Sequence, residues 1–85
     1  MIGRTELGEL AALLRRRLDT IADVELRESD PERQLALLQE VSEAITAFHT
    51  RHRAETPPRL RHFLENSSLQ KALEWVEVEL ANGRS

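Results

Sequence analysis

Apolar residues recur every three or four positions over most of the chain, which is the spacing of one face of an α-helix. Thr5 is placed to cap the first such segment, and Glu6 suits the first turn, where the positive end of the helix dipole favours acids. The pattern predicts a first helix over residues about 5–29. Its apolar stripe consists of Leu7, Leu10, Ala11, Leu14, Leu18 and Ile21, with Leu13 and Val24 at one edge.

A second helix start follows at residue 31. Asp30 suits the N-cap, Pro31 is preorganised for the first helical position, and Glu32 favours the first turn. Because a residue before proline avoids the helical conformation, the first helix should end near Arg27 to Ser29. The second helix is predicted over about 31–54, with a stripe of Leu35, Leu38, Val41, Ile45, Phe48 and His52. Its apolar arc is wider than one neighbour requires, so we expect it to be the central helix.

Two further start signals mark the C-terminal part of the chain. Thr56 is placed as a cap with two prolines in the first turn, where their missing amides cost little. Ser67 and Gln70 have the spacing of a capping box for a last helix. The expected helices run over about 57–66 and 68–82, so the third segment is broken near Asn66-Ser68.

Composition agrees with an all-helical chain. Ala, Glu, Lys, Leu and Arg make up 47 of the 85 residues, close to the share found in long helices. Sheet-forming residues are scarce, with no Tyr and only Trp75, Phe48 and Phe63 as aromatics. We therefore predict one all-α domain over residues 1–85, a three-helix antiparallel bundle whose third segment is broken.

The chain contains no cysteine, which excludes disulfides, thiolate metal sites and cysteine nucleophiles. His49 and His52 stand three residues apart but have only Glu55 as a nearby carboxylate, so we expect no metal site and no cofactor. The sequence shows no signal-peptide pattern and no apolar run of roughly 18–20 residues, so we expect a cytoplasmic protein without a membrane span.

Charge is distributed unevenly along the chain. The formal net charge is −3, yet residues 49–64 carry four arginines against Glu55 alone and contain all three histidines. Arg side chains bind phosphate groups in pairs of hydrogen bonds, so this cluster could bind an anion. The other interpretation is that the cations offset the negative end of the second helix. The acidic chain and the lack of interleaved aromatics argue against nucleic acid. The candidate anion-binding residues are Arg51, Arg53, Arg59, Arg61 and His62.

Trp75 and Val78 form a second apolar patch on the last helix. They lie about 100–160° away from the middle of its main stripe, which consists of Leu69, Ala72, Leu73, Val76 and Leu80. Tryptophan is enriched at interaction hot spots, so the patch indicates an interface with a partner. A wide stripe packed between two helices of the same chain is the other interpretation.

The serine and threonine residues lie at predicted caps and turns, and no glycine-rich phosphate loop occurs, so we expect no catalytic activity. We predict a small protein-interaction or oligomerisation module that forms a homodimer, or binds a protein partner, through Trp75 and Val78. The alternative is anion or nucleic-acid binding through the Arg/His cluster at residues 49–62.

Overall fold

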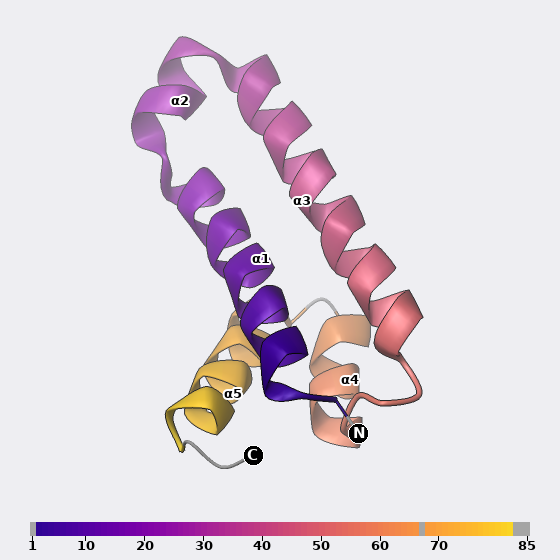
Figure 1. Ribbon diagram of the computed structural model, residues 1–85. Coiled ribbons are helices and arrows are strands. Elements are labelled where there is room, and N and C mark those ends of the chain that lie inside the picture. The colour runs from indigo at the N-terminus through magenta and orange to yellow at the C-terminus, as the bar shows by residue number, and fades with distance from the viewer. Residues whose placement is uncertain (1, 67, 83–85) are drawn as a thin grey trace.

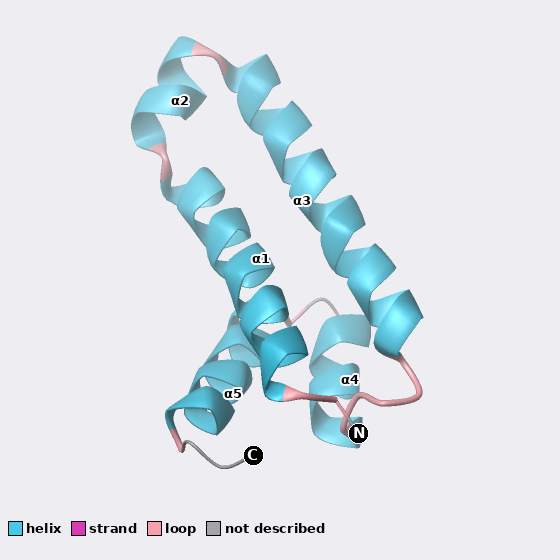
Figure 2. Ribbon diagram, in the orientation of Figure 1, coloured by secondary structure: helices cyan, strands magenta, loops and turns pink. Residues whose placement is uncertain are grey.

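The computed structural model describes residues 2–66 and 68–82 of the chain. These residues form five helices and no strand, which confirms the predicted all-α class. In chain order the helices are α1 (Arg4–Ala22), α2 (Val24–Ser29), α3 (Pro31–His52), α4 (Pro58–Glu65) and α5 (Leu69–Ala81) (Figure 1). Figure 2 shows that short loops join them.

The helices form a long hairpin with a shorter helical pair at one end. α1 and α3 run antiparallel, and α2 lies at the closed end of their hairpin (Figure 1). α5 packs against α1 near the other end, and α4 packs against α5. α1 therefore lies between α3 and α5, so the prediction that the second helix is central is wrong. The described residues form five helices, because the first predicted helix is divided in two and the third predicted segment is broken.

The first predicted helix is divided at Asp23. This residue has φ −77° and ψ 88°, outside the helical region, and it serves both as the C-cap of α1 and as the N-cap of α2. Its carboxylate accepts a hydrogen bond of 2.9 Å from the backbone amide of Leu26. Asp23 thus ends one helix and caps the next, although the helical spacing of apolar residues continues unchanged across it.

α1 also begins earlier than predicted. Gly3 is its N-cap and makes no side-chain cap hydrogen bond, while Thr5 lies inside the first turn, so the predicted Thr5 cap is wrong. The cause is tertiary: Ile2 is buried, and its amide donates to the Glu55 carbonyl at 3.0 Å. This anchor holds the chain where the helix can start at Arg4.

The two proline-marked starts behave differently. Asp30 caps α3 as predicted, because its carboxylate accepts from the Arg33 amide at 3.1 Å and Pro31 is the first helical residue. The predicted Thr56 cap is wrong, since Pro57 is the N-cap of α4. The Thr56 hydroxyl is buried and donates to the His52 carbonyl at 2.7 Å, so it closes α3 and does not open α4.

The predicted break in the C-terminal segment is confirmed. α4 ends at Glu65 and α5 begins at Leu69, with Ser68 as its N-cap residue and no side-chain cap hydrogen bond. The Ser67 half of the proposed capping box lies outside the described residues. The break lets α5 fold back and pack beside α4.

The core lies where α1, α3, α4 and α5 meet. Its largest fully buried side chains are Leu10, Leu14, Val41, Phe48, Leu60 and Val76. An ion pair between Arg15 of α1 and Glu77 of α5 joins two of these helices at the surface. α2 contributes no buried residue, so the closed end of the hairpin projects beyond the core in a molecule of 42 × 24 × 20 Å.

Candidate functional site

Trp75 and Val78 border a shallow groove between α4 and α5. The groove has a volume of about 580 Å³. Trp75 is half-buried and packs against the core, whereas Val78 is 59% exposed. Contacts within the chain therefore bury part of the Trp75 side chain, whereas the Val78 side chain is exposed to solvent. We call this surface the α4–α5 groove; it is lined by Arg59, Phe63, Lys71, Glu74, Trp75, Val78 and Glu79.

Helical spacing explains how these side chains come together. Lys71, Trp75 and Val78 follow one another at steps of four and three residues, so they form one row along α5. Arg59 and Phe63 are four residues apart on α4 and line the opposite side. The lining combines three apolar side chains with two basic and two acidic ones, so its charges balance.

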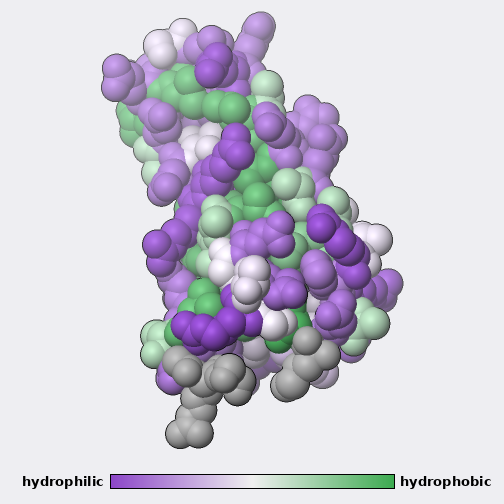
Figure 3. All heavy atoms as spheres, viewed as in Figure 1, coloured by the Kyte–Doolittle hydropathy of each residue, from purple (hydrophilic) through white to green (hydrophobic). Residues whose placement is uncertain are grey.

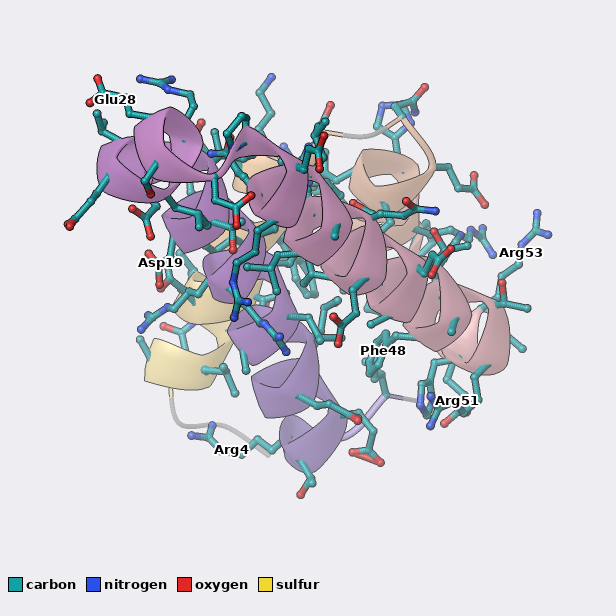
Figure 4. All side chains as sticks on the ribbon, turned by 90° about the horizontal axis from the view of Figure 1, so that it is seen from above. Arg4, Asp19, Glu28, Phe48, Arg51 and Arg53 are labelled. Carbon is teal, nitrogen blue, oxygen red and sulfur yellow. The ribbon has the colours of Figure 1, made fainter. Side chains whose placement is uncertain are left out.

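The Arg/His cluster is not gathered into one site. Arg59 lines the α4–α5 groove, while Nη2 of Arg53 lies 3.5 Å from a Glu65 carboxylate oxygen. The same oxygen lies 3.4 Å from Nε2 of His49. In Figure 4, Arg51 and Arg53 project in different directions from the end of α3.

The remaining members of the cluster have local partners. Nδ1 of His52 lies 3.4 Å from the Glu55 carboxylate, and the His52 ring packs on Phe48 with centroids 4.6 Å apart. His62 is exposed, and its Nδ1 lies 3.1 Å from the amide nitrogen of Asn66. Arg61 is half-buried. No three His, Asp or Glu side chains of the described residues are grouped as metal ligands.

A second apolar surface, which the sequence did not predict, lies toward the closed end of the hairpin. On α1 the exposure of the stripe rises from buried Leu14 through half-buried Leu18 to Ile21, which is 41% exposed. On α3 it rises at three-residue steps from buried Val41 through half-buried Leu38 to Leu35, which is 66% exposed. We call Leu18, Ile21, Leu35 and Leu38 the distal apolar face.

This face is uncovered because the C-terminal helices are too short to follow the whole hairpin. Leu18 lines a surface depression together with Ser68 and Leu69, the residues at the start of α5. α5 therefore covers α1 only as far as Leu18. Ile21 and Leu35 lie beyond it. Their apolar spacing is that of core positions, so the sequence pattern gave no indication that they would be exposed. Figure 3 shows hydrophobic residues at the surface near α2 and between α1 and α3.

The chain matches no protein-family model, no curated protein and no solved structure. No helix of the described residues is both long and apolar enough to span a bilayer. The described residues form a small all-α protein whose exposed apolar surfaces include the α4–α5 groove and the distal apolar face.

Proposed function

We propose that this protein is a small helical interaction module that forms a homodimer through the α4–α5 groove. The observation that carries the proposal is the combination of exposed Val78 and half-buried Trp75 with two charges of each sign around them. A two-fold interface brings the same patch together with itself, so it requires a surface that is self-complementary. A groove whose lining carries two charges of each sign meets that requirement.

The register of α5 specifies a particular pairing. Suppose that two copies of α5 pack antiparallel with the two-fold axis beside Trp75. A residue that precedes Trp75 in one copy then lies opposite the residue that follows Trp75 by the same number of positions in the other copy. Lys71 precedes Trp75 by four residues and Glu79 follows it by four, so Lys71 lies opposite Glu79 of the second copy. The two tryptophans meet at the centre, where large aromatic side chains contribute most to binding.

The arrangement favours this role over anion binding by the Arg/His cluster. Arg53 already lies beside Glu65, and Arg59 belongs to the groove on the α5 side of α4. A phosphate site built from several arginines requires guanidinium groups that converge on one point. The separate positions of these arginines do not provide it.

Light scattering coupled to size-exclusion chromatography tests the homodimer. The expected mass is twice the chain mass of 9.8 kDa, falling toward the monomer on dilution. Val78→Glu should shift the protein to monomer, because it buries a charge at the interface. Leu35→Glu is the matched control, since Leu35 is at least as exposed as Val78 and lies outside the groove.

A charge swap tests the antiparallel register. Lys71→Glu and Glu79→Lys should each weaken the dimer by placing like charges opposite one another, and the double variant should restore it. A wild-type protein that stays monomeric throughout the dilution series would refute the proposal. A dimer that Leu35→Glu disrupts and Val78→Glu does not would place the interface elsewhere.

A further inference from the structure

Both asparagines of the chain lie at the C-terminal end of a helix. Asn66 is the C-cap of α4 and Asn82 is the C-cap of α5. An asparagine can lose its side-chain amide when the backbone nitrogen of the next residue attacks the side-chain carbonyl carbon. Ser67 follows Asn66, whereas Gly83 follows Asn82, and a glycine has no Cβ to hinder this attack. The residue order therefore favours the reaction at Asn82.

The structure separates the two side chains further. Nδ2 of Asn66 donates to the His62 carbonyl at 2.9 Å and lies 3.1 Å from Nδ1 of the same histidine. An attack on Asn66 requires its side chain to leave both contacts, which raises the barrier to the reaction. Asn82 is exposed, and its side chain makes no hydrogen bond with another described residue. Its backbone amide donates to the Val78 carbonyl at 3.0 Å, so the contacts within the described residues hold its main chain and leave its side chain free to rotate.

We infer that Asn82 is a site of spontaneous deamidation. The Gly83 nitrogen loses its proton and forms a bond to the side-chain carbonyl carbon of Asn82. The side-chain amide nitrogen takes up that proton and leaves as ammonia, so that a succinimide ring results. Water then opens the ring at one of its carbonyl groups and leaves either aspartate or isoaspartate. The overall change exchanges ammonia for water, so it needs no oxidant or cofactor, and it replaces a neutral amide by a carboxylate.

The new charge lies where α5 accommodates it poorly. The C-terminal end of a helix carries partial negative charge, which opposes a carboxylate in the last turn. Glu79 precedes Asn82 by three residues, so the two side chains lie on the same side of the helix, where like charges repel. Val78 belongs to the same turn and borders the α4–α5 groove. Deamidation should therefore loosen the end of α5 and alter one edge of the groove, and the reaction does not depend on whether the groove forms a homodimer.

Incubation of the full chain at neutral pH and body temperature, followed by peptide mass spectrometry at intervals, tests the inference. Asn82 should convert to aspartate and isoaspartate at least about tenfold faster than Asn66. In urea that unfolds the chain, Asn66 loses its contacts with His62, so its rate should rise more than the rate at Asn82. An Asn82 that stays intact, or that converts no faster than Asn66, would overturn the inference. A rate at Asn66 that does not rise in urea would contradict the protective role of its hydrogen bonds.

Variants identify the reacting groups and the effect on α5. Gly83→Val should slow the conversion of Asn82 to near the rate of Asn66, because a branched side chain hinders the attacking nitrogen. An unchanged rate in this variant would show that the glycine nitrogen is not the attacking group. Asn82→Asp should reproduce the modified state, with faster hydrogen exchange in the last turn of α5 than in Asn82→Gln, which stays neutral. Equal exchange in these two variants would refute the effect of the charge on α5.

Discussion

Gln34 offers a direct test of what holds α1 and α3 together near the closed end of their hairpin. It is one of two buried polar residues of the described chain, at 8% exposure, and its amide nitrogen donates to the Thr20 carbonyl at 3.0 Å. That carbonyl belongs to the last turn of α1, where the helix stops before Asp23. Gln34→Met keeps the side-chain length and removes the donor.

The expected loss follows from the contacts of the Thr20 carbonyl. A hydrogen bond of this kind contributes about 0.5–1.5 kcal/mol net. The carbonyl also accepts a longer bond of 3.4 Å from the Asp23 amide, so it keeps one partner when glutamine is removed. We therefore expect a loss of about 1 kcal/mol, which lowers the melting temperature of a domain of this size by about 4–8 °C.

Circular dichroism during thermal and urea unfolding, at one protein concentration, measures the loss. Gln39→Met is the matched control, because Gln39 is exposed on the same helix and should change the stability by less than about 0.5 kcal/mol. Hydrogen exchange should also quicken in α2, which has no buried residue of its own. Equal stability of the two variants would refute the role assigned to the Gln34 hydrogen bond.

Two other variants test the helix ends. Thr56→Val should lower the free energy of unfolding in urea by about 1–2 kcal/mol, because the buried hydroxyl that donates to the His52 carbonyl is lost. The same substitution at exposed Thr50 should lower it less. Equal losses would contradict the role of Thr56 in closing α3. Asp30→Ala should cost about 1 kcal/mol by removing the cap of α3, whereas Asp30→Asn, which caps equally well, should stay near the wild type; a loss in both would implicate the charge and not the cap.

The sequence by itself determined the helical class and the helix ends whose signals act within one turn. Asp30 and Pro31 start α3 because a carboxylate and a fixed φ act on the amides beside them. The break before α5 was also predicted from residues near Asn66. Asp23 is also an aspartate that caps a helix, but the sequence did not indicate a helix end there, because the apolar spacing continues without interruption.

Only the tertiary structure decided which parts of each stripe are covered. Ile21 and Leu14 share one stripe, yet one is exposed and the other buried, because α5 reaches only one of them. Thr56 likewise has the spacing of a cap, but its hydroxyl bonds to the preceding helix once the turn folds over it. Periodicity identifies the apolar side of a helix. Burial depends on the lengths and positions of its neighbours, which no local pattern contains, and so the distal apolar face became apparent only in the folded protein.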